Sequence, residues 1–116
     1  MSFDPIIALN HHVSLLTLLK AAKEEYAKAR GITKYAARHT GAMIFAELEK
    51  SKTSMKAHQM WVAEESVGER RYRYGFRRER GEHEISQEDL KLHMRAILGD
   101  ISRELMQLQQ NPGERR

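Results

Sequence analysis

The sequence contains no cysteine. This absence excludes a disulfide scaffold, a thiolate zinc site and a cysteine nucleophile together, and it favours a reducing compartment. No apolar run approaches the ~20 residues that a membrane-spanning helix needs. The first residues, Met1 to Pro5, also lack the basic region of a signal peptide. We therefore expect a cytoplasmic protein with no membrane partner.

Proline is scarce as well, because Pro5 and Pro112 are the two prolines in 116 residues. Both lie near an end, so no proline interrupts a helix between them. Charged residues make up 31% of the chain and hydrophobic residues 41%, which is typical of a globular protein. The net charge of +4 permits an acidic protein or a nucleic acid as partner but requires neither.

The first helical pattern covers residues 5–30. Asp4 is a suitable N-cap, and Pro5 fits the first helical position, where its missing N–H is harmless. Gly31 is placed to end the helix in a left-handed conformation. The middle of this stretch is apolar on more than one face, which indicates a helix that is central to the fold or to a dimer.

The second helical pattern follows Thr33, which we predict to be its N-cap. Apolar residues continue at helical spacing as far as Trp61 and Val62. The polar stretch around Thr53 contains no strong helix breaker. We therefore predict one long helix to about Ser66, with a break near Thr53 as the alternative.

The third helix has the clearest signals. Ser86 is the predicted N-cap, and Asp89 takes the third position of an approximate capping box. An apolar stripe follows at helical spacing and consists of Leu90, Met94, Ile97, Leu98, Ile101, Leu105 and Leu108. The sequence around Pro112 then ends the helix, and residues from about 111 to 116 form a frayed tail.

Between the second and third helices lies a segment rich in arginine, aromatic residues and glycine, which runs from Gly68 to Gly81. Tyr72, Tyr74 and Phe76 alternate with other residues, so the segment is a short hairpin or loop. The fold class that we predict is therefore all-α. We expect a three-helix bundle with long first and second helices and an Arg/Tyr-rich hairpin or loop before the third, in a single helical domain over residues 1–116.

No pattern in the sequence indicates catalysis. The six histidines include no pair spaced four apart and none three residues after a glutamate, so helical zinc and di-iron motifs are absent. No Gly-x-Ser-x-Gly elbow or Walker-type phosphate loop occurs either. We therefore expect a protein that is not an enzyme and has no cofactor or metal. A helical metal-binding protein is the second alternative.

The leading hypothesis is a small regulatory protein that acts by stoichiometric protein–protein binding. It would block a partner's dimerisation or control a transcription regulator, because amphipathic helices suit binding in a groove. The apolar residues also exceed what three helices can bury, which predicts a homodimer or a tight hetero-complex. The alternative is a nucleic-acid-binding regulator that uses segment 70–80, since arginine pairs with phosphate and aromatic rings stack on bases. The candidate partner-binding residues are Leu98, Ile101, Leu105, Leu108, Arg71, Tyr72, Arg73, Tyr74, Phe76, Arg77 and Arg78.

Overall fold

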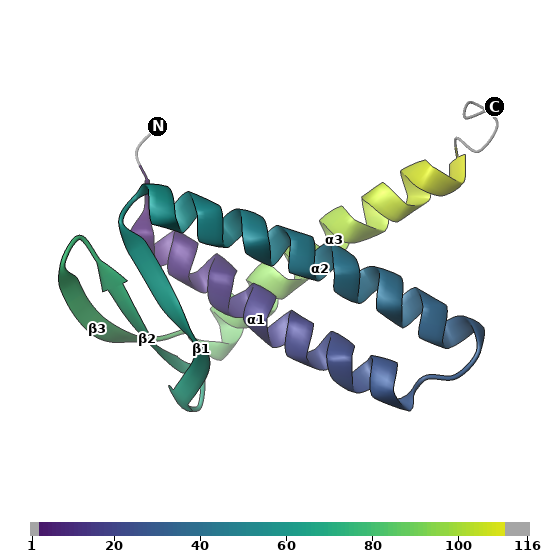
Figure 1. Ribbon diagram of the computed structural model, residues 1–116, viewed down its shortest axis with the longest axis horizontal. Coiled ribbons are helices and arrows are strands. Elements are labelled where there is room, and N and C mark those ends of the chain that lie inside the picture. The colour runs from purple at the N-terminus through teal and green to yellow at the C-terminus, as the bar shows by residue number, and fades with distance from the viewer. Residues whose placement is uncertain (1–2, 111–116) are drawn as a thin grey trace.

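The computed structural model describes the backbone of residues 3–110 and the side chains of residues 3–107. Two long antiparallel helices, α1 (Pro5–Lys28) and α2 (Ile32–Ala57), lie side by side (Figure 1). A three-stranded sheet packs at the end of this pair where α1 begins and α2 ends, and α3 (Gln87–Gln110) follows the sheet. The predicted frayed tail at 111–116 lies outside the described residues.

The start of α1 is as predicted from the sequence. The Asp4 carboxylate accepts hydrogen bonds of 3.0 and 3.2 Å from the backbone N–H groups of Ile6 and Ile7. Gly31 has a φ of +62°, a conformation that suits glycine, but it stands as the N-cap of α2. The prediction of Thr33 as this cap was wrong, because the positive φ of Gly31 reverses the chain early and places Thr33 inside the helix.

The predicted extent of the second helix was also wrong. α2 ends at Ala57, and residues Met60–Gly68 form strand β1 instead of a further helical turn. Gln59 adopts a φ of +59°, which turns the chain out of the helix without a glycine or proline. The residues of β1 then pair with the next strand, so tertiary hydrogen bonding decides their conformation.

The predicted all-α, three-helix-bundle fold class is therefore wrong, because the protein also contains a three-stranded antiparallel sheet in the order β1-β2-β3. Strand β2 (Arg71–Phe76) is central, and β3 (Glu79–Glu84) pairs with it through a two-residue turn. The turn residues Arg77 and Arg78 have φ values of +48° and +74°. Positive φ at both positions matches the twist of a two-residue hairpin.

The core consists of two apolar clusters that share α1. One, the helical cluster, joins all three helices through Leu15 and Leu18 of α1, Ile44 and Leu48 of α2, and Ile97 and Ile101 of α3. The other, the sheet–helix cluster, joins the helical pair to the sheet through Leu9, Met55 and Met60, with Tyr74 and Phe76 packed against them. Each fully buried side chain of this size contributes roughly 1.5–3 kcal/mol to stability. Because α1 supplies Leu15 and Leu18 to one cluster and Leu9 to the other, both clusters depend on this helix.

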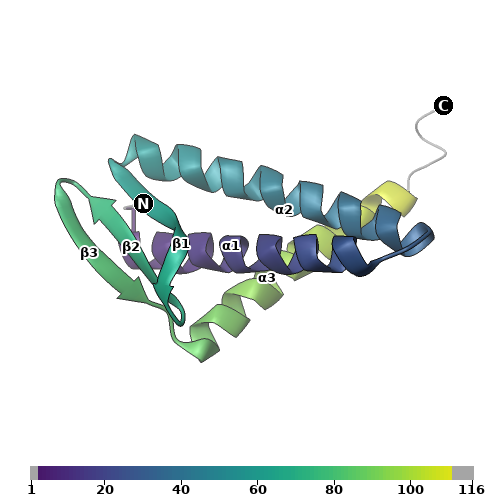
Figure 2. The ribbon, with the colours of Figure 1, turned by 60° about the horizontal axis from the view of Figure 1, so that its bottom comes forward.

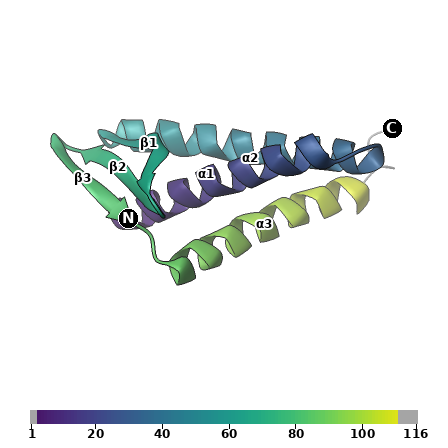
Figure 3. The same ribbon diagram turned by 90° about the horizontal axis from the view of Figure 1, so that it is seen from below.

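Helix α3 runs from the sheet toward the turn end of the α1–α2 pair and crosses it at an angle (Figure 2). Seen from below, α1 lies between α2 and α3 (Figure 3). Accordingly, α3 packs against α1, whereas α2 and α3 have few contacts with each other. The N-cap of α3 is as predicted, since the Ser86 hydroxyl accepts a 3.1 Å hydrogen bond from the Asp89 N–H. Among the described helices, none has the length and apolar character that crossing a bilayer would require.

Candidate functional site

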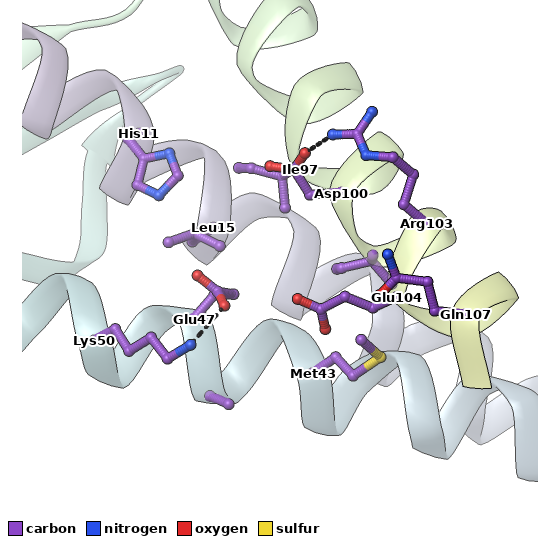
Figure 4. A pocket seen from close by; sticks show the side chains of 12 residues that line it. His11, Leu15, Met43, Glu47, Lys50, Ile97, Asp100, Arg103, Glu104 and Gln107 are labelled. Atoms are coloured by element: carbon purple, nitrogen blue, oxygen red, sulfur yellow. Dashed lines mark hydrogen bonds and ion pairs between the residues drawn. The ribbon is translucent and has the colours of Figure 1, made fainter. Parts of the chain in front are cut away.

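The crossing of α3 over the α1–α2 pair leaves a groove of about 400 Å³ between α2 and α3. Leu15 and His11 of α1 form its floor (Figure 4). Its walls combine apolar side chains from two helices, Met43 and Ala46 of α2 with Ile97 and Ile101 of α3. The groove exists because α2 and α3 both pack on α1 but do not close on each other.

Charged side chains surround this apolar floor. Lys50 pairs with Glu47 at 3.2 Å, and Arg103 pairs with Asp100, each within a single helix (Figure 4). Such surface pairs contribute about 0–1 kcal/mol, so a partner could replace them at little cost. Glu104 reaches from α3 toward α2 and has no ion pair within 4.0 Å among the described residues.

His11 is the titratable group at the floor of the groove. Burial, followed by the neighbouring His93, lowers its pKa below the usual 6.5, while the carboxylates of Glu47 and Asp100 oppose that shift. Its ring lies edge-on to that of His93, with centroids 6.4 Å apart. Within the described part of the chain, no three histidine or carboxylate side chains converge closely enough to hold a metal ion. Because its pKa lies below 6.5, the His11 imidazole is an uncharged hydrogen-bonding group at neutral pH.

The predicted stripe on α3 contributes unequally to this groove. Ile101 is 4% exposed and lines it, whereas Leu105 is half-buried and packs against the helical cluster. Leu98 is 40% exposed and does not line the groove. The side chain of Leu108 lies outside the described side chains. Met43 and Ala46 were not predicted as site residues. The sequence shows their helical spacing, but it does not show that α3 faces them across the groove.

The register of β2 separates the predicted arginine and aromatic residues onto two faces. Arg71 and Arg73 lie opposite Glu84 and Glu82 of β3, and Arg71 pairs with Glu84 at 3.3 Å. The aromatic side chains alternate with these arginines and are half-buried, and two of them pack in the sheet–helix cluster. The residues on this inner face are Tyr72, Tyr74 and Phe76. Arg77 and Arg78 are exposed in the β2–β3 turn.

Polar side chains along α1 form hydrogen bonds to β3 and α2. His83 of β3 donates a 2.6 Å hydrogen bond from Nε2 to the Asn10 carboxamide oxygen, and His12 shares a 2.8 Å hydrogen bond with Ser51 of α2. Ser14 donates to the Asn10 backbone carbonyl at 2.7 Å. Among the described residues, no buried side-chain nitrogen or oxygen lacks a partner. These groups orient the sheet and α2 on α1, so their role is structural.

A comparison of the chain with known proteins found no matching family model, no matching curated protein and no matching solved structure.

Proposed function

We propose that the protein is a non-enzymatic regulator that binds an amphipathic helix of another protein in the groove between α2 and α3. The observation that carries this proposal is an apolar groove in which Leu15 lies at the floor, Ile97 and Ile101 form the α3 wall, and Met43 and Ala46 form the α2 wall. A helix that presents apolar residues at three- and four-residue spacing can bury them on such a floor. The partner helix would thereby fill the space that α2 and α3 leave open between them.

The charges around the groove suit a partner helix with basic residues beside its apolar stripe. Glu47, Asp100 and Glu104 contribute three carboxylates, against the cations of Lys50 and Arg103. Because Glu104 has no ion pair among the described residues, it is available to a lysine or arginine of the partner. Charge complementarity of this kind favours encounter and register more than affinity.

Binding one helix per groove is stoichiometric, which fits regulation by sequestration. A partner whose dimerisation helix occupied the groove could not dimerise, and a transcription regulator controlled in this way would lose its dimer. We also propose the cytoplasm as the compartment, which fractionation of the native cell would test. No catalytic step is proposed, because Glu47 and Asp100 are each paired with a cation of their own helix.

A homodimer is part of the proposal. Ile32 is 88% exposed at the turn between α1 and α2, and Tyr35 and Phe45 are also exposed on α2. Ile32 and Tyr35 are three residues apart and so neighbours on the surface of α2, and adjoining exposed apolar side chains of this size mark surfaces for association. Sedimentation velocity at micromolar concentration should give the mass of two chains, and a monomer at every concentration would contradict this part.

The groove is tested by a matched pair of alanine substitutions. Ala46 and Ala36 are both exposed on α2, but Ala46 lines the groove and Ala36 does not. Ala46→Arg should fill the groove and abolish helix binding, while Ala36→Arg adds the same side chain elsewhere. Arginine is a good helix former, so both variants should fold.

The experiment is nuclease-treated affinity capture from the native cell with wild type and both variants, followed by identification of the retained proteins. A protein retained by wild type and Ala36→Arg but lost with Ala46→Arg supports the proposal. Equal retention by all three proteins, or no retained protein at all, would refute binding in this groove.

A further inference from the structure

We propose that the outer face of the sheet, at the β2–β3 turn, binds single-stranded nucleic acid, with an unpaired base stacked on Trp61. This site is distinct from the groove, and the inference does not depend on the proposed function. It lies on the side of the sheet that faces away from the sheet–helix cluster, because Trp61 alternates with the buried Met60 along β1.

Trp61 forms a flat platform on this face. It pairs across the strands with Gly75, and a Cβ on that glycine would lie 2.1 Å from the indole Nε1 and 2.6 Å from Cε2. The indole therefore lies directly over the β2 backbone, in space that any other residue at position 75 would occupy. The residue is nevertheless 46% exposed, so part of the indole surface is open to a ligand. An aromatic face of this kind stacks with any base.

A hollow of about 340 Å³ lies beside the indole. Its polar lining comes from Gln59, Arg78, Glu79 and Arg80. The arginines offer forked donors to a phosphate, and the Gln59 amide can hydrogen-bond a base edge. Glu79 opposes a phosphate at its own position but can accept a hydrogen bond from the amino group of a base.

Backbone conformation around the hollow is costly for these residue types. Gln59, Arg77 and Arg78 all have positive φ, and they are three of the four non-glycine residues in this state among those described. The Arg77 N–H donates a 3.0 Å hydrogen bond to the Gln59 carbonyl, which joins the two segments. Asn-Gly would form the same turn without that penalty. Strain kept by residues able to bind a ligand indicates a functional site.

The charge around the platform complements phosphate. Residues 71–84 contain five arginines and three glutamates. Arg73, Arg78 and Arg80 are exposed and have no ion pair within 4.0 Å among the described residues, although Glu82 lies opposite Arg73. Single strands fit better than duplex, because the stacking face needs an unpaired base. Tyr74 and Phe76 instead pack against the sheet–helix cluster on the inner face.

The test uses Trp61 as its own reporter, since it is the one tryptophan in the chain. Titration with single-stranded DNA and RNA dodecamers of the same mixed sequence should quench its fluorescence to saturation with at least one of them. In fluorescence anisotropy with the labelled oligonucleotide, Trp61→Ala should weaken binding by roughly 5- to 150-fold. Trp61→Phe should retain most of the affinity, and circular dichroism should show that both variants fold.

A charge-matched pair of double variants locates the phosphates. Arg78→Gln with Arg80→Gln should lower the slope of log affinity against log salt by about 1.4, or about 0.7 per phosphate contact. Arg38→Gln with Arg95→Gln removes two exposed arginines from α2 and α3, and should change the slope little. An equal effect of both pairs would overturn the proposed location.

Absence of both quenching and an anisotropy change would overturn the proposal itself. So would duplex binding as tight as single-strand binding with no quenching, because it would mean that no base stacks on Trp61. A different outcome would assign this face to a protein partner instead. In that case no oligonucleotide would bind, and the wild type would capture a protein that is still retained after nuclease treatment but is lost with Trp61→Ala.

Discussion

Lowering the pH from about 7.5 to about 5 should destabilise the folded chain through His12. This side chain is 1% exposed, and burial followed by the charge of Lys52 lowers its pKa from 6.5 to about 4. The unfolded chain therefore binds a proton in a pH range where the folded chain does not. Stability from the neutral ring is fully present above pH 6.5 and is lost as the pH falls toward 4.

The magnitude follows from the two pKa values of His12. A difference of one in pKa corresponds to 1.36 kcal/mol, so the full loss, which is reached at a pH below both values, is roughly 3 kcal/mol. At about pH 5, where the folded ring is still mostly neutral, the loss is about 2 kcal/mol. His11 and His83 have pKa values lowered mainly by burial, and they add to the loss in the same direction.

Urea unfolding at a series of pH values measures this effect, and His12→Asn separates its source. Asparagine keeps a neutral hydrogen-bonding group near Ser51 but does not titrate. The variant should be less stable than wild type near pH 7.5 and should lose less stability on acidification. His39→Asn, at an exposed position on α2, is the control. A pH dependence in His12→Asn as steep as that of wild type would refute the reasoning.

Three further predictions concern other positions. Gly75→Ala should push the Trp61 indole off β2, because its Cβ would lie 2.1 Å from Nε1; the tryptophan emission should shift to longer wavelength, and an unchanged spectrum would contradict the packing. Ile101→Asp should unfold the chain or cost several kcal/mol, whereas Leu98→Asp, at a 40% exposed position, should fold with a similar circular dichroism melt to wild type. Gly31→Ala should cost roughly 1–3 kcal/mol in thermal unfolding despite open space around it, since its φ of +62° suits glycine; no loss would mean that the turn relaxes.

Much of the helical structure could be predicted because its signals are local. The caps at Asp4 and Ser86 require only a side-chain oxygen within a few residues of the free N–H groups. The burial of Ile97 and Ile101 follows from helical spacing in the same way. Local spacing identifies the buried face of a helix without knowledge of its partner.

The short hairpin predicted between Gly68 and Gly81 is present as β2 and β3, but the third strand, β1, could not be predicted because its signals are disguised. Met60, Trp61 and Val62 fit the end of an apolar helical stripe as well as they fit a strand. The turn before them uses Gln59 at positive φ, and the hairpin turn uses two arginines, so the usual glycine and asparagine markers are missing. Pairing with β2 decides the conformation of this segment, and such long-range pairing has no local pattern.

The candidate groove was beyond sequence reasoning for a different reason. Spacing along α2 does not show that Met43 and Ala46 lie opposite Ile97, because the groove depends on how α3 crosses α1 (Figure 1). Trp61 was missed as a surface residue because it was assigned to a helix. Its cross-strand neighbour Gly75 becomes meaningful once the strand register is known.

The two outer strands of the sheet also determine how the chain avoids aggregation. An edge strand exposes backbone groups that can pair with another molecule, and charge or irregularity on the edge opposes this. Strand β3 carries Glu79, Arg80, Glu82 and Glu84 among its six residues, and the pairing of β1 is interrupted by two register shifts. A second copy would therefore have to desolvate charges or match a distorted edge to extend the sheet. We expect the sheet to resist fibril-like stacking, and any assembly of the chain to form through its helices.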